Sequence, residues 1–171
     1  MLLVYSPNTS HAQPETEQNL IWGKVIRVYD GDTVAIKDDK GQTIRVQLAY
    51  IDAPDMDYVT NERQPLFKDS MDALSRLVMN QEVIIEALGK DSTGKTEGMI
   101  FLDKLNVNVE MVRRGLAEIY EPVRSRPAAY NREYVDQLKE AEETAKADKA
   151  GVWGRSDYIS PYKYRRRHGG Q

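Results

Sequence analysis

The chain has 171 residues, 40% of them hydrophobic and 30% charged, which is typical of one soluble domain with tails. The formal net charge of −3 gives no overall attraction to nucleic acid, so any such binding needs a local patch. The absence of cysteine excludes disulfides, thiolate metal sites and cysteine nucleophiles. Both histidines, His11 and His168, lie in polar terminal segments. Any catalysis is therefore expected to use carboxylates, Arg, Lys and a bound metal.

The first segment, 1–20, is polar and lacks periodicity, which favours a flexible leader. Residues 2–5 are apolar but too few for a complete signal-peptide core, whereas Ser10-His11-Ala12 has the pattern of a small-x-small cleavage site. Two interpretations stay open: the remnant of a secretory signal, which implies a secreted or periplasmic protein, or the plain leader of a cytoplasmic one. No stretch approaches the length of a membrane span, so we expect no membrane partner.

Three short strands are predicted next. β-branched and aromatic residues favour strands over 21–29 and 33–37, and alternating apolar residues favour a third over 42–51. The first turn is Asp30-Gly31-Asp32, with Gly31 available for a positive φ, and 38–41 is a hairpin turn.

The second half mixes helices and strands. Pro65 suits the first turn of a helix, Asn108 is the expected N-cap of another, and polar residues over 89–98 predict a loop. A helix is expected over 65–78, followed by strands over 82–88 and 99–102. Two further helices are expected over 109–114 and 130–150. Short strands separated by turns, with helices packed against them, favour an α+β fold around a small OB-type barrel.

Carboxylates gather at the ends of the predicted strands. Asp30 and Asp32 flank Gly31, and Asp52 and Asp55 follow the third strand. Hard oxygen ligands of this kind suit a Ca²⁺-type ion. The alternative role for Asp32 and Asp52 is to cap turns and strand ends.

Four motifs in this order resemble the staphylococcal nuclease (thermonuclease) family. They are Asp30-Gly31-Asp32-Thr33, Ile51-Asp52-Ala53-Pro54, Met111 to Ala117, and Glu140-Ala141 through Gly151-Val152-Trp153. The resemblance implies a five-stranded OB-fold barrel with three packed helices over 21–155. It also implies a Ca²⁺-dependent phosphodiesterase that cuts DNA and RNA, and we expect a monomer.

The resemblance also implies site residues. Asp32 and Asp52 match metal ligands, and Ala53 matches a position that contributes its backbone carbonyl. Asp30 matches an acidic residue that supports the metal site. Asp55 lies where the family has a Glu, assigned as general base or water-positioner.

Two basic positions of the family are altered. Gln47 lies where the family has an arginine, and Lys95 replaces a second arginine. Hydrolysis of a phosphodiester gathers negative charge that cations stabilise. Lysine keeps the charge but lacks the planar fork of arginine, and glutamine supplies no charge. Arg45, on the same strand face as Gln47, is either a substitute cation or an exposed surface residue. Tyr120 falls near a family tyrosine that contacts nucleotide, although the loop there differs in length.

The C-terminal tail, 156–171, is basic and aromatic. Its tyrosines and arginines could bind single-stranded nucleic acid by stacking and charge neutralisation. Alternatively, Tyr158, Pro161 and Tyr162 dock on the barrel while Arg165 to Arg167 extend into solvent.

Three functions follow from these patterns: a metal-dependent nuclease with weakened activity, a catalytically impaired module that binds nucleic acid or a nucleotide, and a protein-interaction domain. The nuclease is supported by the carboxylates, and the binding module by Gln47 and Lys95. The clustered carboxylates weigh against the interaction domain, because without a metal they would only repel one another.

Overall fold

The computed structural model describes residues 19–57 and 59–167. The predicted leader lies outside these residues, except for Asn19 and Leu20, and Leu20 begins the first strand. None of the described helices is long and apolar enough to cross a membrane.

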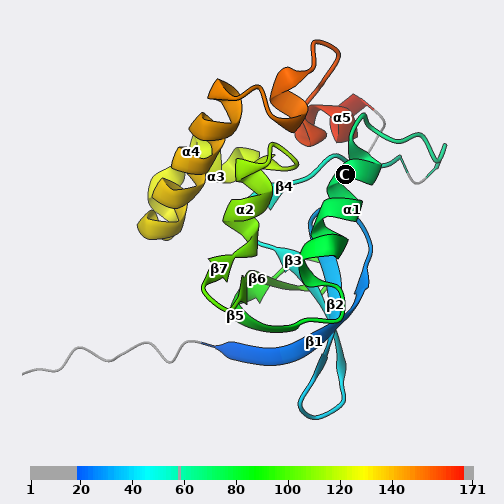
Figure 1. Ribbon diagram of the computed structural model, residues 1–171, viewed down its shortest axis with the longest axis vertical. Coiled ribbons are helices and arrows are strands. Elements are labelled where there is room, and N and C mark those ends of the chain that lie inside the picture. Colours follow the sequence, from blue (N-terminus) through cyan, green and yellow to red (C-terminus); the bar gives the residue numbers. More distant parts are fainter. Residues whose placement is uncertain (1–18, 58, 168–171) are drawn as a thin grey trace, which may run out of the picture.

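Five strands form a closed barrel (Figure 1). They are β1 (Leu20–Val28), β2 (Thr33–Asp38), β3 (Thr43–Leu48), β5 (Glu82–Lys90) and β6 (Thr96–Leu102). Neighbouring strands are antiparallel in the order β3-β2-β1-β5-β6, and a parallel pairing of β3 with β6 closes the barrel. The α+β fold with a five-stranded barrel that the sequence predicts is therefore confirmed.

Shorter elements extend the barrel and cover it. The short strands are β4 (Ile51–Asp52), which pairs with β8 (Glu118–Ile119), and β7 (Leu105–Asn106), which pairs with β6. The helices are α1 (Phe67–Val78), α2 (Val107–Arg113), α3 (Glu121–Ser125), α4 (Arg132–Ala147) and α5 (Pro161–Arg167), with 3-10 turns η1 (Pro127–Ala129) and η2 (Gly151–Gly154). In Figure 1, α4 lies on the outer side of α2, and α5 lies beside the start of α1.

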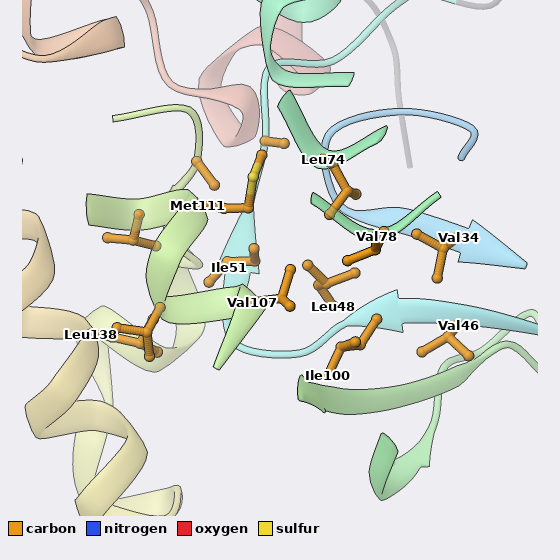
Figure 2. Packing of buried hydrophobic residues seen from close by; sticks show 14 of the residues in the cluster. Val34, Val46, Leu48, Ile51, Leu74, Val78, Ile100, Val107, Met111 and Leu138 are labelled. Atoms are coloured by element: carbon orange, nitrogen blue, oxygen red, sulfur yellow. The ribbon is translucent and has the colours of Figure 1, made fainter. Parts of the chain in front are cut away.

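The core joins the barrel to four helices, α1, α2, α3 and α4. Leu74 and Val78 of α1 are fully buried and point toward Val34 and Leu48 of the barrel (Figure 2). The same buried cluster continues through Val107 and Met111 of α2 to Leu138 of α4. Burial of a large aliphatic side chain contributes about 1.5–3 kcal/mol, so this continuous core fixes α1 and α2 against the barrel end.

Two predicted boundaries were wrong. The polar segment 89–98 is not one long loop, because β5 and β6 extend into it and leave only a short turn around Gly94. The third strand does not reach Ile51, because Tyr50 has a left-handed φ of 68° that bends the chain after β3. The bend separates β4 from β3 and lets Asp52 pair with Glu118.

The predicted cap of α2 was also wrong. Asn106 is the N-cap, with its side chain accepting a hydrogen bond from Val109 N–H at 3.2 Å. Asn108 is instead fully buried, and its side chain donates to the carbonyls of Ala49 (2.9 Å) and Gly98 (3.1 Å). A buried amide needs such partners, so Asn108 ties α2 to the barrel end next to the bend at Tyr50.

Candidate active site

A pocket of about 370 Å³ opens at the end of the barrel, where β3 gives way to β4. Six acidic and three basic side chains line it. Every site residue that the sequence predicts lies on its wall: Asp30, Asp32, Arg45, Gln47, Asp52, Ala53, Asp55, Lys95 and Tyr120. The barrel therefore brings together residues that are far apart in the sequence.

The first turn of the pocket is held against α1. Asp30 Oδ1 accepts a hydrogen bond from Asp32 N–H at 3.0 Å. A Cβ at Gly31 would lie 1.9 Å from Ser70 Oγ and 2.7 Å from Ala53 Cβ. The predicted positive φ was wrong: the turn needs Gly31 because α1 approaches too closely for any side chain.

Asp32 is a buried carboxylate, 8% exposed. Its Oδ2 accepts from Ala53 N–H at 2.8 Å, and its Oδ1 accepts from Gln47 Nε2 at 2.6 Å. Burial raises the pKa of Asp32 well above its usual range, and the charges of Asp30 and Asp52 raise it further. This part of the pocket is therefore short of positive charge.

Gln47 connects Asp32 to Lys95. Its Oε1 accepts from Lys95 Nζ at 3.1 Å and from Thr33 Oγ1 at 2.9 Å. Lys95 also pairs with Asp91 at 3.2 Å. Desolvation opposes ionisation of Asp91, but the hydrogen bonds from Thr93 and Lys95 together outweigh it and lower its pKa to about 2. Lys95 thus brings one positive charge into the pocket, and two partners share it.

Arg45 and Tyr120 lie at the rim of the pocket. The guanidinium of Arg45 stacks over the ring of Tyr29, 4.2 Å from its centroid, which is a cation–π contact. Tyr120 is partly exposed, and its N–H donates to the carbonyl of Tyr50 at 2.9 Å. Burial raises the pKa of Tyr120 above its ordinary value, so the phenol is neutral and available for stacking or hydrogen bonding.

Arg165 of α5 also enters the pocket, whereas one of the two interpretations of the tail had Arg165 to Arg167 extending into solvent. Its Nη1 donates to Asp52 Oδ1 at 2.9 Å and its Nη2 to Asp52 Oδ2 at 2.7 Å, which makes a two-pronged ion pair. Nη1 also donates to Asp55 Oδ2 at 3.1 Å. The expectation of a solvated side chain was wrong for Arg165, because two carboxylates of the pocket compensate its charge.

The same ion pair affects Asp52, which is 6% exposed. Burial raises the pKa of Asp52, and the hydrogen bonds and charge of Arg165 offset part of that rise. The only sequence signal for Arg165 was the basic, aromatic composition of the tail.

The C-terminal segment is docked by specific contacts. Tyr164 is 5% exposed and donates its hydroxyl to the carbonyl of Glu62 at 3.0 Å. Gln64 donates to the carbonyl of Ile159 at 2.8 Å and accepts from Asp55 N–H at 2.7 Å. Gln64 therefore links the pocket loop directly to the segment that carries Arg165.

Asp32 and Asp52 are the candidate metal ligands of the pocket. Asp32 and Asp52 offer the hard oxygens that Ca²⁺ prefers, and both carboxylates are buried in the pocket. Within 19–57 and 59–167, however, no group of three or more acidic or histidine side chains is already arranged to hold a metal ion. The donor chemistry fits, while Arg165 engages both oxygens of Asp52.

Comparison with known proteins identifies the family. The profile described as "Staphylococcal nuclease homologue" matches residues 45–155. An "Uncharacterized endonuclease" of Escherichia coli is 31% identical over 148 residues, which cover 86% of each chain. The "Thermonuclease" of Staphylococcus hyicus is 32% identical over 135 residues, covering 76% of this chain and 74% of that protein. A "Micrococcal nuclease" of Shigella flexneri is 30% identical over 153 residues, covering 84% and 80%.

The fold, the relatives and the matched profile together define a protein of the nuclease class. The chain belongs to the staphylococcal nuclease family, which confirms the resemblance seen in the sequence. Arg165 lies beyond the matched segment.

Proposed function

We propose that this protein is a Ca²⁺-dependent nuclease that hydrolyses phosphodiester bonds in DNA or RNA. The observation that carries the proposal is the pair of buried carboxylates, Asp32 and Asp52, in a pocket that also holds Lys95 and Arg165. The names of the relatives, endonuclease and thermonuclease, support the same reaction.

Asp32 and Asp52 would hold the ion, together with the backbone carbonyl of Ala53. A bound Ca²⁺ would supply electrostatic stabilisation of the charge that develops on the phosphate. Asp32 is held for this role by Ala53 N–H and Gln47. Lys95, fixed by Gln47 and Asp91, would add positive charge on the same wall of the pocket.

Asp55 is the proposed acceptor of a proton from the attacking water. Its backbone N–H donates to Gln64, and its side chain accepts from Met56 N–H at 2.7 Å. These contacts restrain the carboxylate at the pocket wall, and such positioning is what a general base requires. Asp is one methylene shorter than the Glu of the family, and a misplacement of about 1 Å can lower a rate by about 10²-fold.

The second candidate is a module that binds nucleic acid with little hydrolysis. It is favoured by Gln47, which leaves a neutral amide beside Asp32. Loss of one transition-state donor typically lowers a rate by about 10²–10³-fold.

The test is cleavage of end-labelled single-stranded DNA and RNA by the purified protein, with Ca²⁺ or with a chelator. We expect Ca²⁺-dependent cleavage that Asp32→Ala lowers by at least about 10²-fold. Asp39→Ala is the matched control, because Asp39 is an exposed aspartate in the β2–β3 turn, and it should cleave normally. Binding of the nucleic acid without cleavage beyond the Asp32→Ala background would instead support the binding module.

A further inference from the structure

We propose that Arg165 binds the phosphate of the substrate, so that α5 supplies a guanidinium to the pocket. This inference rests on the proposed function and adds to it a specific substrate contact. It concerns a residue outside the segment that matches the family profile.

The hydrogen bonds of Arg165 leave one side of its guanidinium open. The edge formed by Nη1 and Nη2 holds the two oxygens of Asp52, and the second N–H of Nη1 points to Asp55. A guanidinium has five N–H donors. Among residues 19–57 and 59–167, the Nε–H and the second Nη2–H donate to no protein group. These two parallel donors form the Nε–Nη2 edge, which matches two oxygens of a phosphate.

The Nε–Nη2 edge belongs to a side chain that a ligand can reach. Arg165 lines the pocket, and its side chain is 32% exposed, whereas the side chain of its partner Asp52 is only 8% exposed. Its position is already restrained by three hydrogen bonds to carboxylates. Little conformational entropy would then be lost when a phosphate binds, which favours both affinity and orientation.

The charge of the pocket points to the same role. Six acidic side chains line it against three basic ones. Arg45 stacks on Tyr29, Lys95 is bonded to Gln47 and Asp91, and Arg165 is bonded to Asp52 and Asp55. An acidic pocket repels a phosphodiester unless a cation faces it. Arg165 is the basic side chain that lies directly on the carboxylates Asp52 and Asp55.

The fold holds this arginine in place and offers a matched control. Tyr164, the residue before it, is buried and bonded to Glu62, and Gln64 fixes Ile159. Arg166, the residue after it, is exposed and lies 5.7 Å from the ring of Tyr162. The two arginines differ by one position in the helix and carry the same charge, so a comparison of their substitutions separates pocket geometry from overall charge.

The experiment compares Arg165→Ala, Arg165→Lys and Arg166→Ala with the unmodified protein. Binding of a fluorescent single-stranded DNA oligonucleotide is measured by anisotropy in the presence of a chelator, and cleavage is measured with Ca²⁺. Arg165→Ala should weaken binding by about 10-fold and cleavage by about 10²-fold. Arg166→Ala should change both by no more than about 2-fold, because its charge lies outside the pocket.

Arg165→Lys and added guanidinium ion test whether the planar guanidinium, and not only its charge, is needed. Lysine keeps the charge without the Nε–Nη2 edge, so its binding should fall between that of the unmodified protein and that of Arg165→Ala. Free guanidinium should restore part of the lost activity of Arg165→Ala and none in Arg166→Ala. Circular dichroism of each variant shows whether the barrel is folded. If Arg165→Ala disturbs α5, Arg165→Lys still tests the proposal, because lysine retains an ion pair with Asp52.

Two results would overturn the proposal. Unchanged binding and cleavage in Arg165→Ala would make Arg165 a purely structural counterion. Faster cleavage or tighter binding in that variant would show that Arg165 blocks the pocket. If the unmodified protein does not cleave at all, the proposed function fails, and the binding measured in chelator still decides whether Arg165 contacts phosphate.

Discussion

Two buried carboxylates of this protein are each held by an arginine fork, but in opposite electrostatic settings. Glu142 of α4 accepts from Arg124 through both oxygens, at 2.6 and 2.8 Å, and from Lys146 at 2.7 Å. Burial opposes its ionisation, yet the hydrogen bonds from Arg124 and Lys146 bring the pKa of Glu142 below its ordinary value. Asp52 has the fork of Arg165, but burial keeps its pKa raised.

The difference separates a structural ion pair from a candidate active site. Two cations compensate Glu142, and its ion pair with Arg124 connects α4 to α3. Asp52 shares its one arginine with Asp55, and its neighbour Asp32 has no basic partner among the hydrogen bonds of the described residues. A buried carboxylate without a positively charged partner destabilises the folded state. Folded proteins keep such groups at functional sites, where a bound ligand can neutralise the charge.

The first prediction concerns the ion pair between Asp52 and Arg165 in the pocket. Asp52→Asn should lower Ca²⁺-dependent cleavage by at least about 10²-fold, because it removes a carboxylate from the proposed metal site. The free energy of unfolding should change by no more than about 1 kcal/mol, since burial raises the pKa of Asp52 and Arg165 keeps its hydrogen bond to Asp55. Initial rates and urea unfolding measure the two effects. A large loss of stability with normal cleavage would reverse the roles assigned to the two carboxylates.

The second prediction concerns the ion pair between Glu142 and Arg124. Glu142→Gln should destabilise the fold by about 2 kcal/mol, because hydrogen bonds to a charged group are weakened at a buried position. Cleavage per folded molecule should stay normal. Urea unfolding at neutral pH is the measurement, and Glu143→Gln, an exposed neighbour, is the matched control. The effect should shrink in acid: the pKa of Glu142 is lowered in the fold, so its contribution is lost as pH falls through that pKa.

The third prediction concerns the residue that pairs with Asp52 across β4 and β8. Burial, and then the charge of Asp52, raise the pKa of Glu118 to about 7, from an ordinary value of 4.5. The folded state therefore binds the proton more tightly, and stability from this group falls as pH rises from about 4.5 to about 7. Glu118→Gln should raise the free energy of unfolding at pH 8 by about 2 kcal/mol.

Thermal unfolding from pH 4 to pH 8 tests this sign. The gain of Glu118→Gln over the unmodified protein should disappear near the acid end, where both side chains are neutral. An equal gain at every pH would show that the charge of Glu118 is not the cause.

The parts of the site that the sequence predicted are those set by local patterns. Strand alternation and turn residues located Asp32 and Asp52, and the resemblance to the family singled out Gln47 and Lys95, which the structure brings into contact. Asn108 and Gly31 were misinterpreted, because a buried amide and a close helix approach depend on the packing of distant elements. Arg165 was missed for the same reason, since a short aromatic, basic helix carries no periodicity that indicates where it docks.

The contact between Arg165 and Asp52 joins residues 113 positions apart. The turns and hairpins of the barrel close much shorter loops, and contacts distant in sequence carry a larger entropic cost and tend to form later. The guanidinium should therefore reach the carboxylates after the barrel has folded. In a refolding experiment, the circular dichroism of the barrel should recover before the ability to bind an oligonucleotide, and a chain that ends before α5 would have a folded barrel with an incomplete pocket.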